Sequence, residues 1–153
     1  MKRVFITGSA GFIGFHLTKL LLKEGFRVHG FDGMTDYYDV ELKRHRHGIL
    51  LQNTAFTVTE ALLEDEEILS QVTKEFQPDV IIHLAAQAGV RYSLQKPRTY
   101  LQSNLIGTFN VMEVARELEV KHLLMASTSS VYGANEEMPF IETDRTDTQL
   151  SIY

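Results

Sequence analysis

Apolar runs and amphipathic stretches alternate along the chain, which predicts a regular succession of strands and helices. Short runs rich in β-branched and aromatic residues predict buried strands over 3–7, 26–32, 55–58, 79–86 and 121–128. Apolar residues at helical spacing predict helices over 12–24, 62–77 and 97–118. The charged stretch 39–51 is also predicted to be helical, and the residues after Gly133 are predicted to form a loop.

The same spacing predicts which side of each helix is buried. Three apolar sets are expected to face the core: Ile13, Leu17, Leu20 and Leu21 in the first helix, Leu62, Leu69, Val72 and Phe76 in the third, and Leu101, Leu105, Thr108, Met112, Ala115 and Leu118 in the last. Alternation of apolar strands with helices is typical of a parallel sheet covered on both faces, with right-handed crossovers. The predicted fold class is therefore α/β, a doubly wound, Rossmann-type parallel sheet.

Composition narrows the function classes. The chain has 153 residues, enough for one domain, and 44% of them are hydrophobic. A net charge of −5 gives no basic excess for nucleic acid, and the one basic run, Lys43 to His47, is interpreted as a solvated helix face. No apolar run is long enough to span a membrane, and the absence of cysteine suits a cytoplasmic protein.

The stretch "TGSAGFIG" places three glycines between the first strand and the first helix. Gly8 permits a tight turn, Gly11 lets backbone amides approach a pyrophosphate, and Gly14 lets the helix pack close to the sheet. The start of the helix adds free N–H groups and the positive end of its dipole. This context predicts a dinucleotide-binding loop.

Asp32 ends the second predicted strand, 18 positions after Gly14. A carboxylate there can accept hydrogen bonds from the adenosine ribose and repels a 2′-phosphate. The predicted cofactor is therefore NAD rather than NADP. The histidines are interpreted as core, strand-end or surface residues, and no metal site is expected.

Four blocks in order, "TGSAGFIG", "HLAAQAGVRYS", "SNLIGTFN" and "STSSVYG", resemble the extended short-chain dehydrogenase/reductase family. More narrowly, they are similar to NAD-dependent nucleotide-sugar epimerases of the UDP-glucuronate 4-epimerase type. The resemblance runs over residues 1–153 and implies an incomplete NAD-binding Rossmann domain. The catalytic helix and the C-terminal sugar-binding domain of the family are not part of these residues.

The resemblance also implies roles for individual residues. The implied cofactor contacts are Gly8, Gly11, Phe12, Ile13, Gly14, Asp32, Leu84, Ala85, Ala86 and Ser103. The implied substrate contacts are Val90, Arg91 and Ser129, and the implied catalytic pair is Thr128 and Tyr153. The family's acidic adenine contacts are not matched, since Glu60 stands near the first position and Leu63 near the second.

The implied reaction oxidises carbon 4 of a UDP-sugar to a ketone and reduces it on the other face. The phenol of Tyr153 would act as base, helped in the family by a lysine four residues later, which lies beyond this chain. Relatives that dehydrate or decarboxylate the sugar carry acids after the threonine. Ser129 and Ser130 stand there, which favours simple epimerisation. The resemblance implies UDP-glucuronate as the sugar, with UDP-glucose and a dTDP-sugar as open alternatives.

Several alternatives stay open at this point. The motifs are also consistent with a 4,6-dehydratase or a decarboxylase of the same family, and with a non-catalytic NAD-binding module. The 153 residues are expected to be the first part of a longer protein that forms a homodimer. Alone, they are expected to be catalytically inactive.

Overall fold

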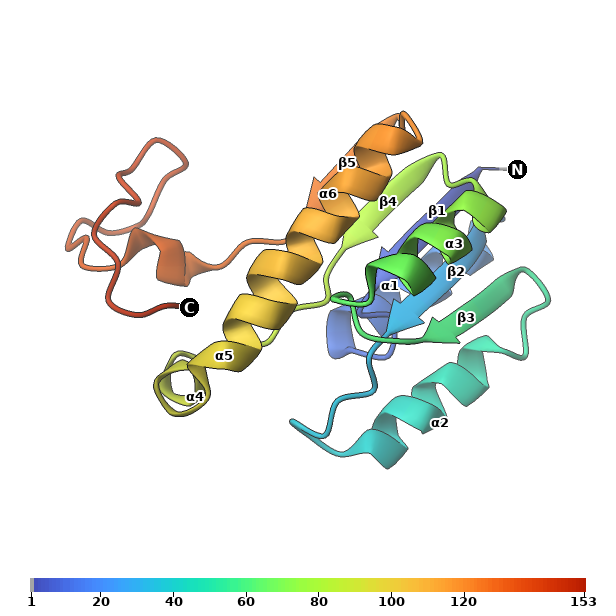
Figure 1. The fold of residues 1–153 in the computed structure, drawn as a ribbon, viewed down its shortest axis with the longest axis horizontal. Helices are drawn as coiled ribbons and strands as arrows, with labels where there is room; N and C mark the ends of the chain where they lie inside the picture. Colours follow the sequence, from blue (N-terminus) through green and yellow to red (C-terminus); the bar gives the residue numbers. More distant parts are fainter. Residues whose placement is uncertain (1) are drawn as a thin grey trace.

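The computed structural model describes residues 2–153, and its centre is a parallel sheet of five strands (Figure 1). The strands are β1 (Arg3–Thr7), β2 (Arg27–Asp32), β3 (Phe56–Glu60), β4 (Val80–His83) and β5 (His122–Met125). Their order in the sheet is β3-β2-β1-β4-β5, and every neighbouring pair is parallel. The chain thus winds outward from β1 in both directions, which confirms the predicted doubly wound α/β fold.

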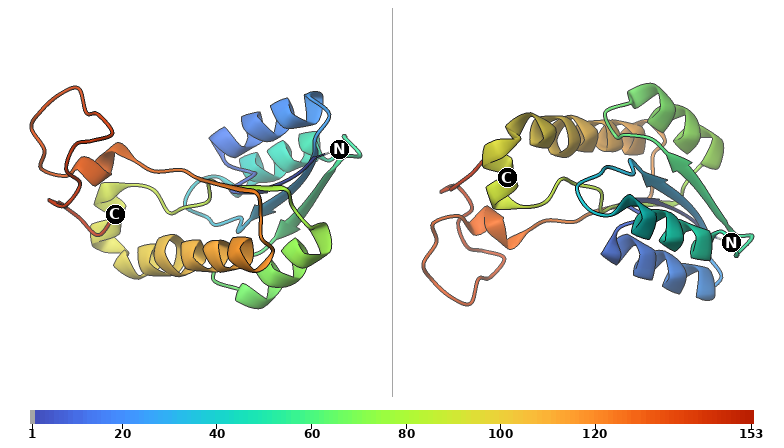
Figure 2. Two further views of the ribbon diagram at one scale, coloured as in Figure 1. Left: turned by 90° about the horizontal axis from the view of Figure 1, so that it is seen from above. Right: turned by 90° about the horizontal axis from the view of Figure 1, so that it is seen from below.

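Helices cover both faces of the sheet. The helical segments are α1 (Phe12–Lys23), α2 (Val40–Leu50), α3 (Glu66–Phe76), α4 (Val90–Gln95), α5 (Pro97–Tyr100), the π-helical η1 (Leu101–Ile106), α6 (Gly107–Glu117) and the 3-10 helix η2 (Ser129–Tyr132). Figure 2 shows α1 and α2 together on one face of the sheet, and α3 and α6 on the other. Segments α5, η1 and α6 follow one another directly, so the predicted long helix is present.

Two apolar cores lie above and below the sheet because successive side chains of a strand point to opposite faces. Beneath α3 and α6 the core is built around Phe5, Phe31, Leu69, Ile81 and Val111. Beneath α1 and α2 it is built around Val4, Ile6, Phe15, Val28 and Phe56. Both cores bury the middle of β1 and β2, which holds the carboxyl ends of these strands in fixed positions.

The buried side of two helices differs from the prediction. In α1, Ile13 and Leu20 are exposed, and Phe15, Thr18 and Leu22 face the sheet instead. In the last helix Ala115 is buried as predicted, but Leu101, Leu105 and Met112 are exposed, and Gly107, Asn110, Val111 and Val114 are buried. The buried residues Tyr100, Gly107, Val111 and Val114 each lie one position before a predicted one, so the buried side of the helix is rotated about its axis relative to the prediction.

Element boundaries also differ in places. Strands β4 and β5 end at His83 and Met125, so the residues that follow leave the sheet earlier than predicted. Helix α3 begins only after Asp65, whose side chain caps it, and Leu62 therefore lies in the preceding loop. The short helix α4 was not predicted.

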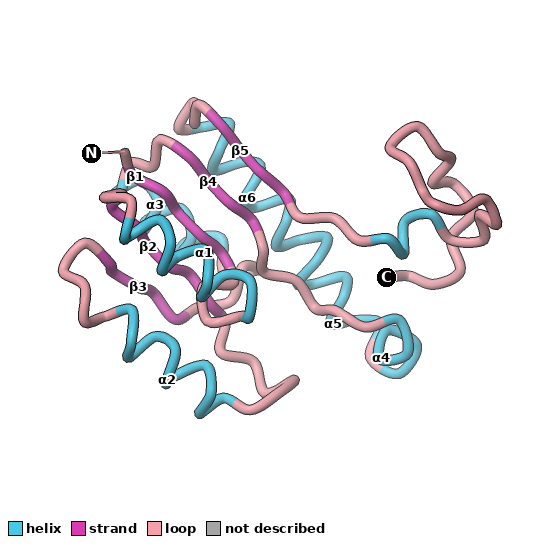
Figure 3. Tube along the Cα trace, turned by 180° about the vertical axis from the view of Figure 1, so that it is seen from behind, coloured by secondary structure: helices cyan, strands magenta, loops and turns pink. Residues whose placement is uncertain are grey.

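Beyond β5 the chain leaves the sheet. Figure 3 shows the segment after β5 running past the end of the sheet into loops, as predicted for the residues after Gly133. Within residues 2–153, none of the helices combines the length and the apolar character needed to cross a membrane.

Candidate functional site

The glycine loop between β1 and α1 is packed so tightly that side chains would not fit. Gly8 has φ of +74°, and a Cβ there would lie 2.8 Å from the backbone nitrogen of Ala85. A Cβ on Gly14 would overlap the carbonyl oxygen of Gly8. These two glycines therefore allow the turn and the close packing of α1 on the end of the sheet, as the sequence predicted.

The first turn of α1 presents backbone rather than side chains. Gly11 is the N-cap residue and supplies no side-chain hydrogen bond to the amides of the first turn. The side chains of Phe12 and Ile13 point outward and are 69% and 64% exposed. What these residues can offer a ligand is their N–H groups at the positive end of a 12-residue helix, an arrangement that suits a phosphate.

Asp32 stands at the carboxyl end of β2 and is only 7% exposed. One carboxylate oxygen accepts a hydrogen bond of 2.9 Å from the N–H of Ala10, and the other accepts one of 3.0 Å from the N–H of Met34. These bonds fix the carboxylate against the glycine loop. Each oxygen keeps a second lone pair, so Asp32 can still accept a hydroxyl from a ligand.

A cleft runs from the glycine loop across the carboxyl ends of β1 and β4, where the winding direction of the sheet changes. In open α/β sheets this is the usual position of a ligand site. Seven of the ten predicted cofactor residues line it: Gly8, Gly11, Asp32, Leu84, Ala85, Ala86 and Ser103. The other three, Phe12, Ile13 and Gly14, lie beside Gly11 in the first turn of α1 and are not part of this lining.

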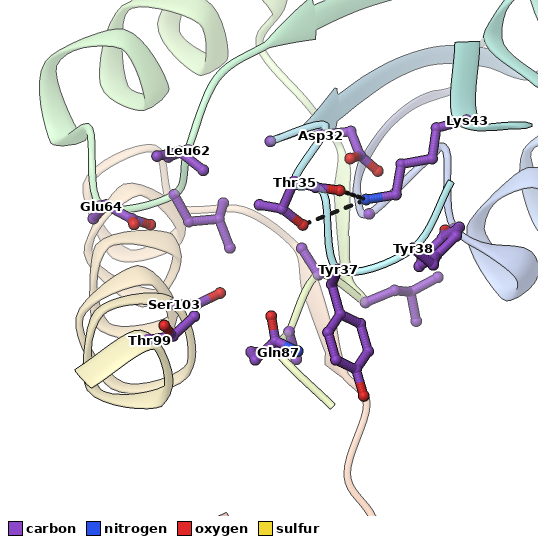
Figure 4. Close-up of a pocket in the computed structure, with 17 residues that line it drawn as sticks. Asp32, Thr35, Tyr37, Tyr38, Lys43, Leu62, Glu64, Gln87, Thr99 and Ser103 are labelled. Atoms are coloured by element: carbon purple, nitrogen blue, oxygen red, sulfur yellow. Dashed lines mark hydrogen bonds between the residues drawn. The ribbon is translucent and has the colours of Figure 1, made fainter. Parts of the chain in front are cut away.

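Other residues of the cleft were not predicted. They come from the loops after β2, β3 and β4, from α2 and from the start of the long helix (Figure 4). They are Gly33, Thr35, Tyr37, Tyr38, Lys43, Leu62, Leu63, Glu64, Gln87 and Thr99. Glu60, the residue nearest to the family's first adenine contact, ends β3 and lines a neighbouring hollow with Glu64 instead.

The basic run on α2, Lys43 to His47, was predicted to be a solvated helix face, and this prediction is wrong for two of its members. Lys43 and His47 are buried rather than solvated, and Arg46 donates a 3.0 Å hydrogen bond to the carbonyl oxygen of Ala10 in the glycine loop. His47 Nε2 lies 2.9 Å from Ser9 Oγ in the same loop. Burial lowers the pKa of His47, although the charges of Asp32 and Glu60 oppose this. Helix α2 thus holds the glycine loop through the contacts of Arg46 and His47.

A sequence signal for this arrangement does exist. Lys43, His47 and Leu50 follow one another at i, i+4 and i+7, so they share one side of the helix, and Leu50 belongs to the core. The apolar end of that stripe indicates that its two basic members point inward.

His83, at the end of β4, ties three elements together. The hydroxyl of Thr7 accepts hydrogen bonds from the N–H groups of Leu84 and Ala85, at 3.1 and 3.0 Å, and therefore donates its own proton to His83 Nδ1 at 2.7 Å. Nε2 then carries the ring proton and donates to Thr108 Oγ1 at 3.0 Å. Burial lowers the pKa of His83 to about 4, in keeping with this neutral, structural role.

Four tyrosines meet beside the cleft. Tyr37 and Tyr92 have ring centroids 5.0 Å apart, and Tyr92 contacts Tyr100 at 6.4 Å. The hydroxyl of Tyr100 donates to the carbonyl oxygens of Ala88 and Gly89. The ring of Tyr153 packs edge-on against Tyr100 at 5.6 Å. This cluster joins the loop after β2 to α4 and α5.

None of the predicted substrate and catalytic residues lines the cleft: Tyr153 belongs to this tyrosine cluster, and the others lie in α4 and at the start of η2. Val90 and Arg91 are the first, exposed residues of α4. Thr128 precedes η2, and its Oγ1 accepts a 3.2 Å hydrogen bond from the N–H of Ser130. Ser129 is exposed. In residues 2–153 no group of three acidic, histidine or cysteine side chains is placed to hold a metal ion.

Known proteins with similar sequences include two UDP-glucuronate 4-epimerases, one of them named as probable. Residues 5–153 match the family described as GDP-mannose 4,6 dehydratase. The chain is 54% identical, over 151 residues, to a probable UDP-glucuronate 4-epimerase of Rhizobium meliloti, covering 99% of this chain and 44% of that protein. It is 42% identical to UDP-glucuronate 4-epimerase 1 of Arabidopsis thaliana, over 98% of this chain and 35% of that protein.

Solved structures agree with these relatives. The UDP-glucuronic acid 4-epimerase of Bacillus cereus, in complex with UDP-glucuronic acid and NAD, aligns with a TM-score of 0.88 and 30% identity, over 98% of this chain and 47% of that one. The UDP-Glc/GlcNAc 4-epimerase of Campylobacter jejuni aligns with a TM-score of 0.90 and 25% identity, over 100% and 45% of the two chains. The present chain spans less than half the length of these proteins.

Proposed function

This chain belongs to the GDP-mannose 4,6-dehydratase family, and we propose that it is the N-terminal, NAD-binding part of an extended short-chain enzyme. We propose that this enzyme epimerises UDP-glucuronate at carbon 4. The observation that carries the proposal is the cleft at the switch point of the sheet, where the glycine loop and Asp32 meet.

The residues of the cleft fit NAD. The N–H groups of the first turn of α1 would hold the pyrophosphate, because the N-cap residue Gly11 has no side chain to cap them. Asp32 would accept a ribose hydroxyl through its remaining lone pairs. Ser103, Leu84, Ala85 and Ala86 would line the rest of the cofactor's path. Bound NAD would supply the acceptor, and later the donor, of a hydride.

The choice of substrate rests on similarity and on two serines. The Rhizobium meliloti relative is named a probable UDP-glucuronate 4-epimerase, and the Bacillus cereus epimerase was crystallised with UDP-glucuronic acid. Ser129 and Ser130 follow Thr128, so neither position offers an acid for dehydration or decarboxylation. Val90, Arg91 and Ser129 are the proposed substrate contacts.

The proposed proton chemistry belongs to Tyr153 and Thr128. The phenol would remove the proton of the sugar's 4-hydroxyl, and the hydroxyl of Thr128 would hydrogen-bond the same oxygen. A free phenol, with a pKa of about 10, needs a nearby cation to act near neutrality. In the family a lysine four residues after the tyrosine supplies it. The isolated 153-residue chain is therefore proposed to bind NAD without turning over substrate.

A homodimer is the proposed assembly. Leu101, Leu105, Phe109 and Met112 form an exposed apolar stripe along η1 and α6. Such a stripe on a long helix suits burial against the same helix of a second copy.

The activity can be tested on a polypeptide that continues this chain to the length of its relatives. Incubated with NAD and UDP-glucuronate, it should form the carbon-4 epimer, which proton NMR distinguishes by the coupling of the sugar H-4. Tyr153→Phe should lose this activity while keeping NAD binding. A 4-keto-6-deoxy product, a decarboxylated sugar, or NAD binding with no turnover at all would each contradict the proposal.

A further inference from the structure

Lys43 is the least exposed lysine in the cleft region, although it lies in the middle of a charged helix. It is 4% exposed and lines the cleft together with Asp32. Its Nζ donates a 2.6 Å hydrogen bond to the carbonyl oxygen of Thr35 and lies 3.4 Å from Thr35 Oγ1. The same nitrogen lies 4.4 Å from the ring centroid of Tyr38.

This ammonium group has an unused donor. It carries three N–H bonds, and within residues 2–153 its hydrogen bonds go to the two oxygens of Thr35. No carboxylate lies within ion-pair distance of it in the part of the chain that the structure describes. The carbonyl oxygen of Thr35 and the ring of Tyr38 stabilise this cation, but neither is a charged acceptor, so a ligand in the cleft can supply an acceptor for the remaining N–H.

The residues around Lys43 indicate which group of a ligand its free N–H would contact. Lys43 and Asp32 approach the same corner of the cleft from α2 and from the end of β2 (Figure 4). Desolvation lowers the pKa of Lys43, and the charges of Asp32 and Asp36 oppose this shift. A cation and an anion side by side match a hydroxyl, which can accept from one and donate to the other.

We infer that Lys43, together with Asp32, binds the adenosine ribose. Its free N–H donates a hydrogen bond to the 2′-oxygen, and Asp32 accepts a hydrogen bond from the proton of the same hydroxyl. The inference rests on the proposed NAD site and deepens it. Lys43 also supplies a positive charge where a 2′-phosphate of NADP would lie. Asp32 and Lys43 therefore oppose each other in cofactor selection, and discrimination against NADP is weaker than Asp32 alone would produce.

The variant that separates these roles is Lys43→Gln. Glutamine keeps an N–H donor for the carbonyl of Thr35 but removes the positive charge, so the loop after β2 remains tied to α2. By calorimetry this variant should bind NAD about tenfold more weakly than the wild type, the effect of one charge-assisted hydrogen bond. It should lose more than that for NADP, which widens the NAD preference.

Two control variants accompany it. Arg44→Gln removes a positive charge from the neighbouring position, where the side chain is 61% exposed and pairs with Glu41, and should leave both affinities unchanged. Lys43→Arg keeps the charge and should restore NADP binding toward the wild-type value. Thermal unfolding of every variant shows whether the fold is kept.

A ligand pair tests the same contact in the wild type, should Lys43→Gln not fold. ADP should bind about tenfold more tightly than 2′-deoxy-ADP, because the 2′-oxygen has two partners. Equal affinities for this pair would overturn the inference. So would a Lys43→Gln variant that binds NAD and NADP as the wild type does, or one that loses both by the same factor without rescue by arginine. A folded wild type that binds neither NAD nor ADP would overturn the proposed function itself, and this inference with it.

Discussion

At the scale of single residues, Gly8 and Gly48 differ in the space that each would leave for a side chain. A Cβ on Gly8 would press on the backbone of Ala85 at a φ of +74°, whereas one on Gly48, in α2, would meet nothing within 4 Å. Gly8→Ala should destabilise the fold by about 1–3 kcal/mol. Gly48→Ala should stabilise it by about 0.5–1 kcal/mol through helix propensity.

Urea unfolding of the two variants measures both effects. Gly8→Ala should also weaken NAD binding, because the turn positions the first amides of α1. Two alanine variants with the same stability would contradict the account of the glycine loop.

Two buried histidines make stability depend on pH. Burial lowers the pKa of His83 to about 4, and burial together with the charge of Arg27 lowers that of His29 to about 4. In the unfolded chain both would titrate near 6.5, so below that pH the unfolded state binds more protons. Stability should therefore fall as the pH drops from 6.5 to 4, by about 3 kcal/mol for each histidine.

His29→Phe tests one of these contributions. The variant loses the hydrogen bonds of the ring to Thr57 and Thr59 and should be less stable at pH 7. Because it has one buried histidine fewer, its unfolding free energy should fall less steeply between pH 6.5 and 4. A slope equal to that of the wild type would show that His29 is already charged in the folded state.

How far the residues could be predicted depended on the range of their contacts. The glycines and Asp32 act through their own turn and strand end, so spacing along the sequence was enough to find them. Lys43 and Arg46 contact other segments instead, Thr35 in the loop after β2 and Ala10 in the glycine loop. Which way they point depends on how α2 docks onto the sheet, and a run of charged letters does not contain that information.

At the scale of elements, α3 shows how one residue sets a boundary. Asp65 is the N-cap, and its carboxylate accepts a 3.1 Å hydrogen bond from the N–H of Ile68. Asp65→Ala should lower the free energy of unfolding by about 1 kcal/mol, whereas Asp65→Asn should keep most of the stability because the amide oxygen also accepts. Chemical denaturation distinguishes the two, and equal losses would mean that charge, not capping, matters here.

Two anchored positions hold the π-helical segment and the start of α6. Within the segment, Asn104 exchanges hydrogen bonds with the backbone of Gln87, at 2.7 and 2.9 Å. Downstream, Gly107 allows close contact with Leu63, and Asn110 donates to the carbonyl oxygen of Leu63 at 2.9 Å. Since both anchors are distant in sequence, helical periodicity predicted the helix but not its buried side.

At the scale of the whole molecule, the alternating pattern was sufficient to predict the sheet and its double winding. It did not place the predicted catalytic pair, because Thr128 and Tyr153 lie in a segment with little regular structure. Their positions depend on contacts such as that of Tyr153 with Tyr100, which no local pattern encodes.

The proposed dimer gives a prediction at this scale. Placing a charge in the middle of the apolar stripe, as in Phe109→Glu, should dissociate the dimer, because the carboxylate would be buried without a partner. Sedimentation velocity should then show a monomer. Ile68→Glu, on the exposed side of α3, is the matched control and should leave the assembly intact. A wild type that is monomeric at high concentration would contradict the dimer proposal.

Amide NMR of the chain during titration with NAD is the most direct test of the proposed cofactor site, because the pyrophosphate is expected at the first turn of α1. The largest shifts should occur at Gly11, Phe12 and Ile13, with further shifts at Asp32 and Ala85. Shifts confined to other parts of the chain, or none at millimolar NAD, would contradict it.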